Sequence, residues 1–256
     1  MINFFKQTKL YFNYSKQKYY KNHFYNQSII NDKYLDIFDS IVKDGITIIP
    51  NFLSNEIIDK MVDETKEQLN QVVKNNYNNT KHFFFPNFGV YRILECDKIS
   101  KSSNIFFDNK MIEQLAKAYV STDVSSFQKM IEIRPDKGKK SIADDFHFDD
   151  WRHRFKSFLY LTDIDPDNGP LVYLKGSHKQ GKWRQEKEFE YFRDGKSGSY
   201  GRYSKNEVSE LKQKYNFEQI RGVCSKGTLI IADTRGLHKG TPIKNRKRIL
   251  LANYFR

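Results

Sequence analysis

The stretch Gly227–His238 reads GTLIIADTRGLH, and its two halves differ in character. Residues 228–232 form a run of β-branched and apolar side chains, which is typical of a buried strand. Residues 233–238 are polar and contain a glycine, which predicts a turn directly after that strand. The sequence therefore places His238 just past the end of a buried strand, where sheet proteins often carry functional side chains.

Further strand-like segments surround this one in the middle and the second half of the chain. They are short and bounded by Gly, Pro or Asn, and they lie at residues 89–94, 126–134, 155–161, 171–174 and 248–255. The first half has apolar residues at helical spacing, at 32–42, 54–73 and 110–119, with one short strand at 46–49. This pattern predicts a mainly β protein, a sandwich or barrel, with flanking helices and an α-helical N-terminal region.

The length of 256 residues fits one large domain or two small ones. We expect a single domain over residues 31–256, because strand-like segments continue to the end of the chain. Residues 1–30 are rich in aromatic and amide side chains, and we expect an N-terminal arm that is packed on the body or flexible. Residues 179–219 are charged, aromatic and irregular, and we interpret them as an insertion that covers the core as a lid.

The chain carries 44 Lys and Arg against 31 Asp and Glu, a formal charge of +13. Its basic residues are spread over the sequence, which favours a solvated surface and leaves an anionic substrate open. No nucleic-acid reader motif accompanies them, so nucleic acid is not the expected partner. No apolar run reaches the roughly 20 residues of a membrane span. The two cysteines, Cys96 and Cys224, form no paired motif, which favours a reducing, cytoplasmic location. The oligomeric state is not indicated.

A metal-binding pattern lies in the segment FHFD at residues 146–149. His147 and Asp149 are two residues apart, so on an extended chain both point to the same side. Such a pair alone is weak evidence, but His238 can complete a set of two imidazoles and one carboxylate with open coordination positions, as in non-haem Fe(II) oxygenases. Ten residues later Arg248 begins the last strand, where its guanidinium can bind a carboxylate in a bidentate manner.

Several motifs occur in a fixed order. They are His147-x-Asp149, LTDIDPDNGPL at 161–171, GSH at 176–178, GTL at 227–229, DTRGLH at 233–238, and Arg248. Together they resemble the phytanoyl-CoA dioxygenase-like family of Fe(II)/2-oxoglutarate-dependent oxygenases, over about residues 125–256. The resemblance implies a double-stranded β-helix core, also called a jelly-roll or cupin-like fold.

The resemblance also implies the roles of individual residues. His147, Asp149 and His238 would hold Fe(II), and Arg248 would bind the distal carboxylate of 2-oxoglutarate. Weaker candidates are Lys156, Ser157 and Gln128 for 2-oxoglutarate, and Trp151 and Arg152 for the substrate.

The implied reaction uses O2 to hydroxylate a small molecule, while 2-oxoglutarate is decarboxylated to succinate and CO2. The ligand carboxylate is present at Asp149, as in the hydroxylating members of the family, whereas halogenating members carry a small residue there. Two alternatives remain open. One is a non-catalytic jelly-roll module that binds a metal or ligand, and the other is a nucleic-acid-directed oxygenase, suggested by the positive charge.

Overall fold

The computed structural model describes residues 25–74, 82–85, 90–98, 100–135, 142–150, 152–193 and 201–256, together with Thr8. Trp151 and most of the predicted arm at 1–30 lie outside these residues. Of the arm, residues 25–30 pack on the body. The backbone N–H of Asn26 donates to the carbonyl of Ala118 over 2.9 Å, and Ile30 is buried.

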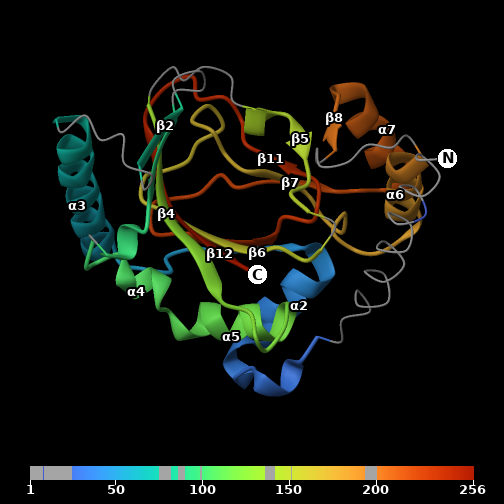
Figure 1. Ribbon diagram of the computed structural model, residues 1–256, viewed down its shortest axis with the longest axis horizontal. Helices are drawn as coiled ribbons and strands as arrows, with labels where there is room; N and C mark the ends of the chain where they lie inside the picture. The colour runs from blue at the N-terminus through green and yellow to red at the C-terminus, as the bar shows by residue number, and fades with distance from the viewer. Residues whose placement is uncertain are drawn as a thin grey trace.

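Two antiparallel sheets face each other (Figure 1). The larger sheet has the order β1 (Ile46–Ile49), β10 (Leu229–Asp233), β6 (Phe155–Tyr160), β12 (Arg248–Phe255), β4 (Ser126–Arg134), β3 (Val90–Leu94) and β2 (His82–Phe85). The smaller has the order β8 (Arg202–Tyr203), β5 (Phe146–His147), β11 (His238–Lys239), β7 (Val172–Leu174) and β9 (Gln219–Arg221). The predicted mainly β, jelly-roll architecture is confirmed.

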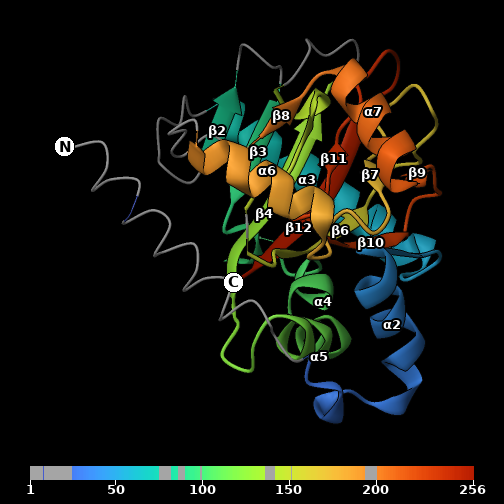
Figure 2. The same cartoon turned by 90° about the vertical axis from the view of Figure 1, so that its right-hand side faces the viewer.

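Helices cover the outer sides of both sheets (Figures 1 and 2). Against the larger sheet lie α2 (Leu35–Asp44), α3 (Asn55–Lys74), α4 (Asn104–Phe107) and α5 (Lys110–Tyr119), and beside the smaller sheet lie α6 (Lys182–Arg193) and α7 (Lys205–Tyr215). Short 3₁₀ turns occupy Gln27–Ile29, Asp32–Tyr34, Cys96–Lys98 and Ile142–Asp144. None of the described helices is long and apolar enough to cross a membrane.

Strand alternation divides the side chains of the larger sheet into two sets. On β4, β6 and β12 the outward set includes Ile131, Leu159 and Leu251, which are fully buried in one apolar core with the helices. The inward set faces the smaller sheet, because successive side chains of a strand point to opposite faces. It is partly polar, and it forms the floor of the cavity described below.

The predicted strands at 46–49, 126–134 and 248–255 and the helix at 110–119 are confirmed with the same bounds. The description of 179–219 as irregular is wrong. This segment contains α6 and α7, and β8 extends the smaller sheet. The missed signal is a capping box, in which the Ser204 hydroxyl accepts from the Glu207 N–H and the Glu207 carboxylate accepts from the Ser204 N–H.

Candidate metal centre and co-substrate cavity

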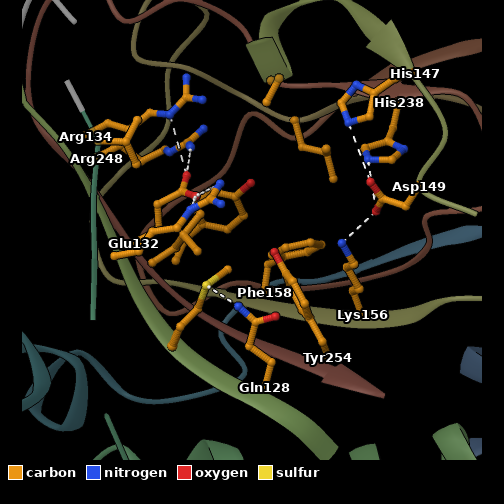
Figure 3. Close-up of a pocket in the computed structure, with 18 of the residues that line it drawn as sticks. Gln128, Glu132, Arg134, His147, Asp149, Lys156, Phe158, His238, Arg248 and Tyr254 are labelled. Atoms are coloured by element: carbon orange, nitrogen blue, oxygen red, sulfur yellow. Dashed lines mark hydrogen bonds and ion pairs between the residues drawn. The ribbon is translucent and has the colours of Figure 1, made fainter. Parts of the chain in front are cut away.

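A cavity of about 440 Å³ lies between the two sheets (Figure 3). The larger sheet lines it with the inward side chains of β3, β4, β6 and β12, and the smaller sheet with residues of β5, β8 and β11. Polar groups gather on two sides of it in Figure 3, with the histidines on one side and the arginines on the other. The volume lies within the range typical of small-molecule sites.

The histidine side is the predicted metal centre. His147 on β5 and His238 on β11 are directly paired across the sheet, so their rings come to the same face, with centroids 4.5 Å apart. Asp149 follows β5, and each of its carboxylate oxygens lies 3.7 Å from the Nε2 atom of one histidine. One donor atom from each residue lies within 4.8 Å of the others, which is the grouping that a single metal ion requires.

The protonation of this group suits a metal. Nδ1 of His147 lies 2.8 Å from the carbonyl of Asp145, and Nδ1 of His238 lies 2.9 Å from that of Gly236, so each Nδ1–H donates and Nε2 is left as a lone-pair donor. Burial lowers the pKa of His147, and it lowers that of His238 to about 4. Burial acts to raise the pKa of Asp149, but Lys156 and His238 hold it well below its usual range. Neutral imidazoles and an ionised carboxylate fit Fe(II).

The buried carboxylate of Asp233 links the segment that follows Asp149 to the segment that precedes His238 by hydrogen bonds. Asp233 accepts hydrogen bonds from Nδ1 of His153 at 2.7 Å and from the backbone N–H of Arg154 at 2.9 Å. The Tyr119 hydroxyl donates to the same carboxylate over 2.8 Å, and the N–H of Asp149 donates to the carbonyl of Thr234. The position of Asp149 relative to the strand end before His238 is therefore set by hydrogen bonds.

Lys156, a predicted 2-oxoglutarate contact, points into the cavity from β6 (Figure 3). Its ammonium lies 2.6 Å from Oδ2 of Asp149 and 3.8 Å from the ring centroid of Tyr254. The lysine therefore lies beside the metal ligands. There it places a positive charge next to the position where the keto-acid end of a metal-chelating co-substrate would bind.

On the other side of the cavity, Arg92, Arg134 and Arg248 surround Glu132; we call these four residues the arginine cluster. The sheet register brings them together, since Arg92 lies opposite Glu132 across β3 and β4, and Arg248 lies opposite Arg134 across β12 and β4. The Glu132 carboxylate accepts from Arg248 at 2.6 Å and from Arg92 at 2.9 Å, with Nε of Arg134 at 3.5 Å.

The arginine cluster has capacity for one more carboxylate. Arg134 also pairs with Asp144 at 3.0 Å, so three guanidinium groups face two carboxylates. The Arg248 side chain is buried and also donates to the carbonyl of Gly169, yet its Nε has no hydrogen-bond partner among the described residues. A buried donor without a partner is costly. The distal carboxylate of 2-oxoglutarate would balance the excess positive charge of the cluster.

The other predicted site residues are placed as follows. Gln128 lines the cavity, with its amide 3.6 Å from Sδ of Met130. Ser157 lies on the opposite face of β6, among the strand positions that face the helices, so its prediction as a co-substrate contact is not supported. Arg152 is exposed and pairs with Asp150 at 3.1 Å outside the cavity. Trp151 lies outside the described residues.

Sequence reasoning missed Glu132, Arg134 and Arg92. A signal for two of them was present: Gln128, Glu132 and Arg134 are separated by even numbers of residues on one predicted strand, so they share a face. Polar residues on the inner face of a strand indicate a lined cavity. The partner Arg92 needs the strand register and has no signal of its own.

Glu132 should make the stability of the protein depend on acid pH. Burial acts to raise its pKa, but Arg92, Arg248 and Arg134 lower it from 4.5 to about 2. A depressed pKa contributes stability above the unfolded value, and this contribution is lost as the pH falls from about 4.5 towards 2. We expect the contribution of Glu132 to the free energy of unfolding to fall by about 2 kcal/mol between pH 6 and pH 3.

The measurement is urea unfolding of the wild type and of Glu132→Gln at both pH values. The variant, which cannot titrate at this position, should lose less stability than the wild type over this interval. Glu113→Gln, at a more exposed carboxylate on α5, serves as the control. Equal losses of unfolding free energy in the wild type and in Glu132→Gln would show that the arginines do not lower the pKa of Glu132.

Two imidazoles and a carboxylate at one end of a jelly-roll cavity, with an arginine cluster at the other, are the arrangement of a non-haem iron, 2-oxoglutarate-type site. The family model described as phytanoyl-CoA dioxygenase (PhyH) matches residues 41–249, and the chain belongs to this family. It is thereby placed among the Fe(II)/2-oxoglutarate-dependent oxygenases and related enzymes. A comparison with curated protein sequences found no match.

Solved structures share the fold at low identity. The structure of EctD from S. alaskensis with bound Fe has a TM-score of 0.66 at 14% identity, covering 91% of this chain and 79% of that one. The non-heme alpha ketoglutarate dependent epimerase SnoN from nogalamycin biosynthesis has a TM-score of 0.61 at 12% identity, covering 87% and 81%. HygX from Streptomyces hygroscopicus, with nickel, 2-oxoglutarate and hygromycin B bound, has a TM-score of 0.55 at 12% identity, covering 88% and 87%.

Proposed function

We propose that this protein is an Fe(II)- and 2-oxoglutarate-dependent dioxygenase that hydroxylates a small molecule. The observation that carries the proposal is that the metal-binding group and the arginine cluster face one cavity from its two sides. The relatives with bound Fe or with 2-oxoglutarate support the choice of cofactors. The positive lining of the cavity favours a substrate that carries negative charge.

The roles of the chain's own residues follow from their contacts. His147, Asp149 and His238 would hold the iron, and Arg248, which lines the other side of the cavity, would bind the distal carboxylate of 2-oxoglutarate. Lys156 would keep Asp149 ionised and attract the keto-acid end. When bound, iron with 2-oxoglutarate and O2 would supply the oxidising chemistry, and the lining of the cavity would position the substrate beside it.

We also propose that residues 31–256 act as one domain, because β1 pairs with β10 and the carboxy-terminal β12 lies at the centre of the same sheet. The cysteines Cys96 and Cys224 are unpaired, which supports the proposed cytoplasmic location.

Hydroxylation is the choice that most needs a test, because the structural relatives include an epimerase and a carbocyclase. The first experiment titrates anaerobic apo-protein with Fe(II) and 2-oxoglutarate and monitors the visible charge-transfer band of the chelate. We expect the band to appear with equimolar iron. Its absence in folded protein would reject the oxygenase and favour a non-catalytic binding module.

The second experiment identifies the reaction type with ¹⁸O2. Once a substrate stimulates succinate formation, a hydroxylase transfers one labelled oxygen atom to the product. A product without label, formed together with succinate, would reassign the protein to the epimerase-like or cyclase-like reactions of the same cofactors.

A further inference from the structure

The segment between β7 and β9 contains Arg202, which lines the metal side of the cavity. Its strand β8 pairs with β5, and Arg202 lies directly opposite His147. Residues directly opposite each other on neighbouring strands point to the same face. The next residue, Tyr203, is buried in the apolar cluster with Phe148, Trp183 and Leu211, so Arg202 is on the cavity face of β8. It is also solvent-exposed, which places it at the mouth.

The cavity as a whole has an excess of positive charge. Among the described residues that line it, five are cationic and two are anionic; they are Arg92, Arg134, Lys156, Arg202 and Arg248, against Glu132 and Asp149. Asp144, which does not line the cavity, pairs with Arg134 and offsets one of these charges. Fe(II) and doubly charged 2-oxoglutarate cancel each other, so the rest of the excess would persist in the loaded site.

The cations differ in where they lie. Arg92, Arg134, Arg248 and Lys156 stand on strands of the larger sheet. Arg202 stands on the smaller sheet, directly opposite His147, in a segment that the sequence marks as an insertion. A guanidinium binds carboxylate, sulfate and phosphate in a bidentate manner. Its place next to His147 would hold the bound group within reach of the metal centre.

We propose that Arg202 recognises an oxyanion group, a carboxylate or a phosphate, on the substrate of this enzyme. This inference rests on the proposed function, because it assumes that the substrate enters the cavity beside the iron. It assigns substrate selection to β8 of the 179–219 insertion, while the strands of the larger sheet hold the co-substrate.

The test measures binding of phenyl phosphate, phenylacetate and the neutral benzyl alcohol to the anaerobic, Fe(II)- and 2-oxoglutarate-loaded full chain, by calorimetry and by shift of the charge-transfer band. We expect at least one of the two anions to bind in the millimolar range and the alcohol not to bind. Arg202→Gln should weaken binding of that anion about tenfold or more, since a charged hydrogen-bonding partner is lost. The relative strengths of the two anions distinguish a phosphate from a carboxylate substrate.

The control is Arg221→Gln, which removes an exposed arginine of β9 that does not line the cavity. It should bind the anion as the wild type does. Equal anion binding by the wild type and Arg202→Gln would overturn the inference, and would also be the result if the anion bound only to the metal. Failure of both anions to bind the loaded wild type would overturn it as well. Failure of the charge-transfer band in the wild type would instead reject the proposed function.

Discussion

Asp149→Asn should abolish 2-oxoglutarate turnover, whereas Asp150→Asn, one residue further on, should leave it largely intact. The two carboxylates are adjacent in sequence but differ in partners. Asp149 faces both histidine Nε2 atoms at 3.7 Å, whereas Asp150 pairs with Arg154 and, at 3.1 Å, with Arg152. Removing the negative charge at position 149 would take one donor from the proposed metal-binding group and leave Lys156 uncompensated beside the two histidines.

The effect of Asp149→Asn should exceed the 10–100-fold loss that follows when only an outer partner of a ligand is removed, so we expect at least about a 100-fold fall in succinate formation. His238→Ala should reduce succinate formation by a similar factor, because it removes another member of the same group. The measurements are Fe(II) affinity, the charge-transfer band and substrate-independent succinate formation. Wild-type turnover in Asp149→Asn, or equal losses in Asp149→Asn and Asp150→Asn, would contradict the assignment of the metal centre.

Arg248→Ala should raise the KM for 2-oxoglutarate about 30- to 100-fold with a smaller change in kcat. Its guanidinium would contact the distal carboxylate, which does not react, so the interaction stabilises the bound and the transition state equally. Loss of a charged, buried hydrogen-bonded pair corresponds to about 2–3 kcal/mol. Glu132 would still be paired with Arg92 and Arg134, so the variant should fold.

Arg246→Ala is the matched control for this prediction. Arg246 lies two residues earlier in the sequence, its side chain is 72% exposed, and its nearest carboxylate, on Asp165, is 3.8 Å away. The KM for 2-oxoglutarate should stay within about twofold of wild type, as for a surface substitution away from the site. If Arg246→Ala raised KM and Arg248→Ala did not, the co-substrate site would lie at the loop before β12 and not in the arginine cluster.

Much of the fold follows from local sequence. The strand β12 and the helix α5 have strong periodicity and clear boundaries, so their extents follow from hydrophobic spacing. The two helices of the 179–219 segment were missed, because a charged surface helix such as α6 has little apolar periodicity to reveal it. Its neighbour α7 had only the capping box at Ser204 as a signal.

The sequence by itself predicted the candidate metal-binding group and Arg248, because the spacing of His147 and Asp149 and the order of the motifs before His238 are visible without a structure. It also determined the strands that carry Gln128 and Lys156. Neighbouring residues of a strand point to opposite faces of the sheet, so the strand position decides which of them line the cavity. Ser157 follows Lys156 directly on β6 and therefore points away from the cavity.

Only the tertiary structure decided which charged groups meet. Glu132 and Arg92 are 40 residues apart, Glu132 and Arg248 are 116 apart, and Arg202 meets His147 through the pairing of two short strands. Such contacts depend on the register between strands that are distant in the chain, and local propensity does not encode that register. The physical reason is that burial penalises each charge on its own and strengthens the attraction between opposite charges, and both effects exist only once the two sheets have packed around the cavity.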